Sequence, residues 1–321
     1  MRELTYEFVV PSGVYLIDVD PWDSLEVLRY GLRMQVRKPI TNRKPVKVAE
    51  TIGNQGVDLG YTVMHVGVDV EDNAPNPDWR VPFEVVTECL HWIRVFGRQY
   101  LVGAIRTGTN TVARGSIIAA PDDYANFGAT QSPIVVSPLS KELWSQIGIE
   151  VASCNVPTIP DFMLCDAMLS LHERDYLQAV ILLGVTAELE LNAFIDDLVS
   201  KQSGPLQKLY DERKYQFAWK LNNIPQILGA ESYKLQNEQA TGKLCKLYEL
   251  RGQAVHRAKC VLDEVDKTTG KNQTVEIGFN HVAGFIYAVE DFLRWTKLQR
   301  SRLGLKTARP FDSPIKAMIG G

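Results

Sequence analysis

The sequence predicts a two-domain protein, with an α+β domain at residues 1–155 followed by an all-α helical bundle at residues 160–302. Three observations support this division. The chain of 321 residues is long for a single hydrophobic core. A segment with two prolines, residues 156–161, interrupts it near the middle. After that segment the apolar residues recur mainly at helical spacing. Residues 303–321 are expected to form a basic carboxy-terminal tail.

Strands and helices are both expected before the proline segment. Residues 4–19 alternate in polarity around a Pro-Ser-Gly break, which predicts two strands of a hairpin. Leucines at helical spacing predict a helix at 22–36, and the composition of residues 61–70 favours a strand. A loop at 72–82 precedes the remaining predicted elements, which are a helix at 83–96 that ends near Gly97 and strands at 100–105 and 111–119.

Helices alone are expected after the proline segment, and Asp161 is a candidate N-cap for the first of them. A polar loop is expected at 263–276. Five helices joined mostly by short connections are typical of a compact bundle. The predicted helices cover residues 162–172, 175–201, 215–228, 242–262 and 279–302.

Composition excludes several classes of protein. Hydrophobic residues make up 45% and charged residues 23%, as in ordinary globular domains. We find no apolar run near the 18 or so residues of a membrane helix, and the acidic start does not resemble a secretion signal, so a cytoplasmic location is expected. Five cysteines without a Cys-x-x-Cys pair indicate reduced thiols. No metal site and no cofactor are expected, and His65, His91, His172 and His281 are interpreted as structural.

The segment Arg251-Gly-Gln-Ala-Val-His256 carries the chemistry of most interest. An imidazole can take the proton of a ribose 2′-hydroxyl, and a guanidinium can stabilise the charge that develops on the phosphate. Together they can cleave RNA without a metal ion. So short a motif also arises by chance, and its neighbours must support it.

Arg251 occupies an apolar face of the predicted helix at 242–262, together with Leu244, Leu247, Tyr248, Val255, Ala258 and Leu262. An unpaired guanidinium there is costly, so Arg251 needs an acid, an anionic ligand or a wet crevice. Glu190 lies in the same way inside an apolar stripe of the helix at 175–201. The sequence therefore predicts an ion pair between Glu190 and Arg251, with Glu188 as the alternative partner.

His256 lies about 120° around the helix from the centre of that face, beside Arg257 and Lys259. One helix would not bring it next to Arg251. A symmetric contact between two copies of the helix could do so, and a homodimer is therefore expected.

Two stretches are rich in lysine and arginine and contain no acid. They cover residues 27–49 and 292–310. Such stretches can neutralise phosphates, although a solvated surface is the simpler explanation. The candidate RNA-binding residues are Arg257, Lys259, Arg294, Lys297 and Arg300. Gly53-Asn-Gln-Gly56 and Thr107-Gly-Thr-Asn110 are interpreted as turns, and Ser116 and Ser132 lack the surroundings of a nucleophile.

Residues 166–180, Asp-Ala-Met-Leu-Ser-Leu-His-Glu-Arg-Asp-Tyr-Leu-Gln-Ala-Val, together with the Leu189-Glu190 step and Arg251-x4-His256, resemble the HEPN domains over about residues 160–300. The resemblance implies a HEPN-like bundle that dimerises. It further implies a metal-independent endoribonuclease of the toxin or antiviral-defence type, with His256 as the acid–base residue and Arg251 as the phosphate-binding residue. Residues 1–155 would then sense a trigger or recruit the target.

Gly252 departs from the family pattern, which commonly has a polar residue directly after the arginine. The alternative is a catalytically inactive HEPN-like module for dimerisation or binding. Function would then reside in the amino-terminal domain or in a partner protein encoded in the same operon. The sequence leaves both interpretations open.

Overall fold

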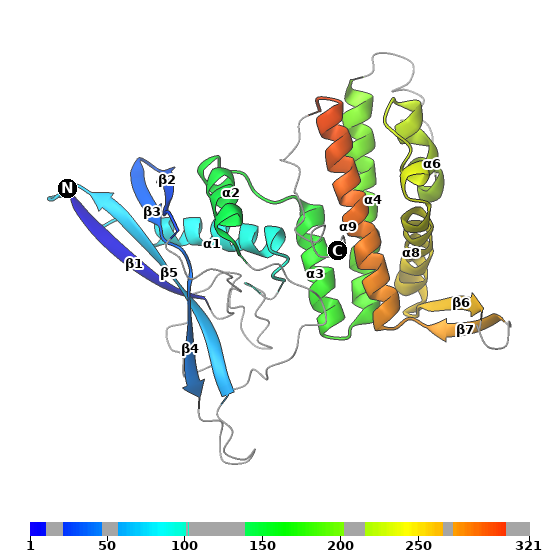
Figure 1. The fold of residues 1–321 in the computed structure, drawn as a ribbon, viewed down its shortest axis with the longest axis horizontal. Coiled ribbons are helices and arrows are strands. Elements are labelled where there is room, and N and C mark those ends of the chain that lie inside the picture. The colour runs from blue at the N-terminus through cyan, green and yellow to red at the C-terminus, as the bar shows by residue number, and fades with distance from the viewer. Residues whose placement is uncertain are drawn as a thin grey trace. The chain divides into compact units, whose positions relative to one another are not determined.

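The computed structural model describes residues 1–10, 22–46, 57–100, 102, 139–201, 216–265 and 272–305. The chain divides into two compact units, with the boundary between Pro157 and Thr158. The amino-terminal unit is rich in strands and the carboxy-terminal unit is mostly helical, as the sequence predicts (Figure 1).

An antiparallel sheet forms the amino-terminal unit. Its order is β1-β5-β3-β2, and β4 pairs with the first half of β5 as a two-stranded ribbon (Figure 1). The strands are β1 Arg2–Val10, β2 Leu25–Arg29, β3 Leu32–Val36, β4 Ile40–Val46 and β5 Val57–Val70. The predictions of a strand near residue 4 and of another at 61–70 are confirmed, but β1 pairs with β5. The expected hairpin partner falls on residues 11–21, outside the described residues.

The predicted helix at 22–36 is wrong, because these residues form the hairpin of β2 and β3. Tyr30 and Gly31 both have positive φ, 50° and 79°, which is the backbone of a two-residue hairpin turn. Along β2 every second side chain is buried, including Val27, whereas Leu28 is exposed. The leucine spacing suggested a period of 3.6, but the residues that are buried follow a period of two.

Two helices cover the sheet. Helix α1, Arg80–Phe96, ends at Gly97 as predicted and contacts β1 and β5. Helix α2, Lys141–Ala152, packs on α1 and β2 and was missed by the sequence analysis. Its start carries a recognisable signal, since the Ser140 side chain accepts a hydrogen bond from the backbone N–H of Leu143 at 3.3 Å.

The helical unit begins with a cap that the sequence analysis assigned to the wrong residue. The hydroxyl of Thr158 accepts a hydrogen bond from the backbone N–H of Asp161 at 3.3 Å, so Thr158 is the N-cap. Asp161 lies in the first turn, where its carboxylate accepts a hydrogen bond from the Thr158 hydroxyl at 2.7 Å. Helix α3, Ile159–His172, therefore starts inside the proline segment at residues 156–161.

Helix α4 is at the centre of the bundle, in contact with α3, α6, α8 and α9 (Figure 1). All five predicted helices are present, and the helix at 279–302 has the predicted bounds. The helices are α3 Ile159–His172, α4 Tyr176–Ser200, α6 Phe217–Ile227, the short α7 Tyr233–Gln236, α8 Glu238–Arg257 and α9 Phe279–Arg302.

The bundle is not all-α, because the stretch predicted as a polar loop contains a hairpin. Strands β6, Val261–Val265, and β7, Asn272–Glu276, pair in antiparallel register between α8 and α9. The predicted helix at 242–262 included Val261 and Leu262 because they are apolar. Valine favours strands, and both residues belong to β6.

Helix α4 also tests the expectation from sequence that no segment spans a membrane. By length and composition α4 could cross a bilayer, with 25 residues and a mean hydropathy of 1.4 in its most apolar window. Of that window, 56% is buried inside the protein, and packing against four helices accounts for its apolar composition. The exclusion stated from sequence was therefore too strict, and α4 alone is weak evidence for a membrane protein.

Several expectations fall outside the described residues. They are most of the predicted strand at 100–105, the whole predicted strand at 111–119, the turns at 53–56 and 107–110, Ser116 and Ser132, and the tail beyond residue 305.

Candidate functional site

Helix α8 carries both residues of the Arg-x4-His motif. It begins at Asn237, whose side chain accepts a hydrogen bond from the backbone N–H of Ala240 at 3.0 Å. It ends at Ala258, which adopts a left-handed backbone with φ of 50°. The predicted extension to Leu262 is wrong, because alanine gives no local signal for such an end. Ala258 and Leu262 are thus not part of the helical face that contains Arg251.

The side chain of Arg251 lies at the interface of α8 with α4 and is 30% exposed. Its stem packs on Gly184 of α4. A Cβ atom at residue 184 would lie 2.7 Å from Arg251 Cβ and 2.8 Å from Cγ. The helices approach this closely because residue 184 has no side chain. The ring of Tyr248 lies 5.8 Å from the guanidinium carbon, within the range of a cation–π contact.

Glu188 is the acid that pairs with Arg251. The distance from Arg251 Nη2 to Glu188 Oε2 is 3.2 Å. The expected pairing with Glu190 is wrong, and the alternative partner is the observed one. Glu188 follows Gly184 by one turn and so lies on the same side of α4, whereas Glu190 is rotated from it by about 200°.

The guanidinium of Arg251 is only partly satisfied. Its Nε atom is buried and has no hydrogen-bond partner among the residues that the structure describes. A solvent-accessible ion pair contributes about 0–1 kcal/mol, and a buried unpaired donor costs about 1–3 kcal/mol. The observed position of this side chain is therefore weakly held at its charged end.

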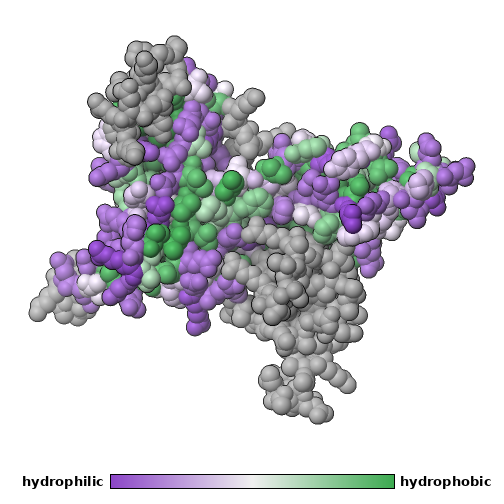
Figure 2. Space-filling view, turned by 180° about the vertical axis from the view of Figure 1, so that it is seen from behind, coloured by the Kyte–Doolittle hydropathy of each residue, from purple (hydrophilic) through white to green (hydrophobic). Residues whose placement is uncertain are grey.

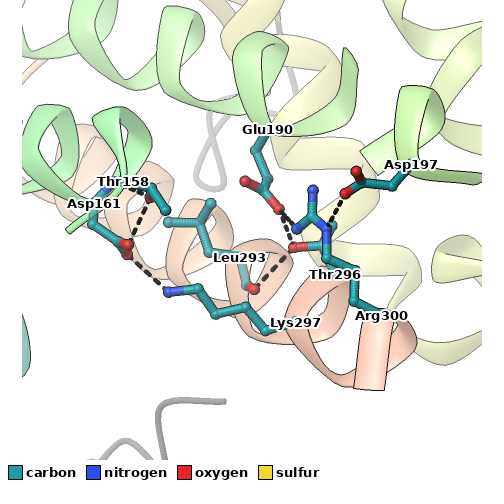
Figure 3. A network of polar contacts seen from close by, with 8 residues as sticks. All are labelled: Thr158, Asp161, Glu190, Asp197, Leu293, Thr296, Lys297 and Arg300. Carbon is teal, nitrogen blue, oxygen red and sulfur yellow. Dashed lines mark hydrogen bonds and ion pairs between the residues drawn. The ribbon is translucent and has the colours of Figure 1, made fainter. Parts of the chain in front are cut away.

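Glu190 belongs to a buried cluster between α4 and α9 (Figure 3). Its carboxylate accepts hydrogen bonds from Arg300 and from the hydroxyl of Thr296. Arg300 also donates from Nε to Asp197 Oδ2 at 2.6 Å. Burial alone would lower the pKa of Arg300, but Glu190 and Asp197 raise it above its ordinary value. Arg300 is therefore a permanently charged part of the helix packing.

A second ion pair ties α9 to α3. Lys297 Nζ lies 2.9 Å from Asp161 Oδ1, and both side chains are largely buried (Figure 3). Arg294 lies 3.7 Å from Asp291 on its own helix and stays about one-third exposed. The assignment of Lys297 and Arg300 to an RNA-binding stripe is therefore corrected. The helix turns these cations toward acids of neighbouring helices.

His256, Arg257 and Lys259 are all exposed at the end of α8. His256 follows Arg251 by five positions, which corresponds to about 140° of rotation and roughly 7.5 Å along the helix axis. One chain thus brings Arg251 together with Glu188, and leaves His256 in a separate group with Arg257 and Lys259.

The other histidines have local contacts or lie on other elements. His65 lies 3.3 Å from Glu7 on the sheet, and the Nδ1 of His281 accepts a hydrogen bond from the backbone N–H of Gly278 at 3.0 Å. The cysteines are free thiols. Within the described part of the chain, no group of three or more His, Cys, Asp or Glu side chains could hold a metal ion.

Sequence reasoning missed two features that matter here. The sequence analysis passed over Gly184 in the apolar helix, although a glycine in a helix interior costs about 1 kcal/mol relative to alanine and so marks an unusual position. In the sheet unit, the buried Arg29 lies 2.7 Å from Glu88 of α1. Its position in an alternating strand would have indicated burial, had the strand been recognised.

Comparison of the chain with family models, with curated proteins and with solved structures finds no match. The resemblance to HEPN domains therefore rests on the residues quoted above.

Proposed function

We propose that the helical unit is a metal-independent endoribonuclease of the toxin or antiviral-defence type that acts as a dimer. Arg251 would bind the phosphate, and His256 would transfer the proton. One observation carries the proposal. Among the residues that the structure describes, partly exposed Arg251 has one acidic partner and an N–H without an acceptor, and it lies on the same helix that ends in exposed His256 and Arg257.

The reaction follows from these groups. His256 takes the proton of a ribose 2′-hydroxyl, and the oxygen attacks the adjacent phosphorus. The bond from phosphorus to the 5′-oxygen breaks, and that oxygen takes up a proton from an imidazolium. The products are a 2′,3′-cyclic phosphate and a 5′-hydroxyl. Arg251 stabilises the extra charge on the phosphoryl oxygens during attack.

A second copy of the chain would bring His256 close to Arg251, which a single chain does not do. Helix α4 carries a partly exposed apolar stripe at i, i+4 spacing, which we call the α4 stripe: Ile181, Leu182, Val185 and Leu189, the last 40% exposed. Apolar residues gather on the face of the helical unit seen in Figure 2. Glu188 and Arg251, one acid and one base, lie beside this stripe. In the proposed dimer, a two-fold contact buries the stripe and brings the α8 helices of two protomers together, so that His256 of one protomer lies near Arg251 of the other.

Exposed cations would supply affinity for RNA without sequence preference. Arg257 and Lys259 are exposed, and Arg294 is partly so. Each contact of this kind makes binding weaker at higher salt. An RNA substrate agrees with the cytoplasmic location expected from the sequence, which stays a prediction.

The test is cleavage of mixed RNA in the presence of EDTA by wild type, His256→Ala and His65→Gln. The last variant is a control that removes a histidine from the other unit. Wild type and His65→Gln should cleave equally, and His256→Ala should lose about 10²-fold or more in rate. Equal cleavage by all three, or loss of activity with EDTA, would exclude this mechanism.

A catalytically inactive dimerisation or binding module is the second candidate. The ion pair between Arg251 and Glu188 favours it, because a guanidinium that already has an acid can serve packing alone. Gly252 favours it as well, since it offers no polar side chain beside Arg251. This function predicts a dimer in sedimentation experiments and no cleavage by wild type, with the activity in residues 1–155 or in a partner protein.

A further inference from the structure

The carboxylate of Glu188 lies beside one of the N–H groups through which Arg251 could bind a phosphate. Guanidinium groups bind carboxylates and phosphates through the same N–H donors. One such donor, Nη2, lies 3.2 Å from Glu188 Oε2, and both side chains are about 30% exposed. An RNA phosphate that approaches Arg251 from solvent would compete with Glu188 for this donor.

The contact is built so that this competition is possible. Gly184 holds only the stem of Arg251, since the close approach involves Cβ and Cγ. Beyond the stem, the guanidinium has one ion pair and a buried Nε without a partner among the described residues. Rotation of the outer side chain toward solvent would give up the ion pair and the contact with the Tyr248 ring, and would allow Nε to find an acceptor.

We propose that Glu188 is a competing carboxylate that holds Arg251 until the phosphodiester of a single-stranded RNA replaces it. The inference rests on the proposed function and assigns a regulatory contact to the same site. Glu188 therefore lowers the affinity for RNA and reduces binding of anions that make only one weak contact.

Binding of a 2′-O-methyl oligonucleotide, which cannot be cleaved through its 2′ position, tests this directly. Fluorescence anisotropy would compare wild type with Glu188→Gln and with the control Glu249→Gln. Glu249 is an exposed acid of α8 that lies 3.1 Å from Lys246, so both variants remove one negative charge. Glu188→Gln should bind about two- to fivefold more tightly, and Glu249→Gln should change little.

The double variant identifies the group through which Glu188 acts. In an Arg251→Gln background, Glu188→Gln should no longer increase affinity. The inference is overturned if Glu188→Gln weakens binding, if Glu249→Gln has the same effect, if the increase persists without Arg251, or if no form binds the oligonucleotide.

The outcome is separable from that of the cleavage assay. A wild type that cleaves no RNA but shows the expected affinity changes would exclude the nuclease and retain the competing carboxylate. Cleavage that depends on His256, with no effect of Glu188→Gln on affinity, would retain the nuclease and exclude the competing carboxylate.

Discussion

Two arginines contact the same central helix, α4, in opposite ways. Arg300 is buried between α4 and α9 and binds the carboxylates of Glu190 and Asp197. Arg251 lies at the other side of α4 and its side chain is about three times as exposed (30% against 11%), with Glu188 as its one acid in the described part of the chain. Burial and the number of acidic partners thus distinguish a cation that stabilises the bundle from one that an incoming anion can reach.

The difference has an electrostatic cause. A buried guanidinium is stable only when its charge and its N–H groups are matched, and Arg300 has two carboxylates for this purpose. A half-exposed guanidinium keeps part of its hydration and tolerates a single partner. Variants of the two sites should therefore differ in size of effect and in sensitivity to salt.

The largest effect is expected for Arg300→Leu. It leaves Glu190 buried without a counter-charge, which should lower the free energy of unfolding of the helical unit by about 3–5 kcal/mol. The control Arg302→Leu removes an exposed pair with Glu231 and should cost less than about 1 kcal/mol. Urea unfolding followed by circular dichroism measures both. Similar losses of stability in Arg300→Leu and Arg302→Leu would show that the buried ion pair of Arg300 stabilises the helical unit no more than an exposed one.

An intermediate effect is expected for Gly184→Ala. The added methyl group would meet the stem of Arg251 at less than 3 Å, and relief of this overlap should cost about 1–3 kcal/mol. Gly252→Ala is the matched control, because a Cβ there meets nothing within 4 Å and alanine favours a helix by about 1 kcal/mol. The control should raise the midpoint of thermal unfolding. A Gly184→Ala protein as stable as wild type would show that α4 and α8 are not closely packed at this level.

The smallest effect on stability is expected for Glu188→Gln, at less than about 1 kcal/mol. Because both side chains of the pair are about 30% exposed, ions should screen it, and 1 M NaCl should remove most of the difference from wild type. The deficit of Arg300→Leu should persist in the same salt. Unfolding curves at low and high salt provide the measurement, and a salt-independent loss in Glu188→Gln would place this pair with the buried cluster.

The fold was predictable where the sequence carries long helical periods. Helices α4 and α9 have enough turns for their apolar faces to be unambiguous. The prediction for residues 22–36 was wrong because Leu25, Leu28 and Leu32 match a helical spacing. The turn at Tyr30-Gly31 divides this segment into two short strands. The predicted end of α8 was wrong because Ala258, a strong helix former, adopts a left-handed backbone before the β6–β7 hairpin. Short elements depend on neighbours that a local pattern does not include.

For the candidate site, the sequence by itself determined that charged residues lie on apolar helix faces and require partners of opposite charge. Only the tertiary structure decided which partner each one has. Glu190 binds Arg300, which sequence reasoning had assigned to RNA, and Arg251 binds Glu188. Helical periodicity specifies the direction of a side chain about its own axis, whereas an ion pair depends on the rotation and separation of two helices. Those are set by packing contacts such as Gly184 against Arg251, which join residues far apart in the chain.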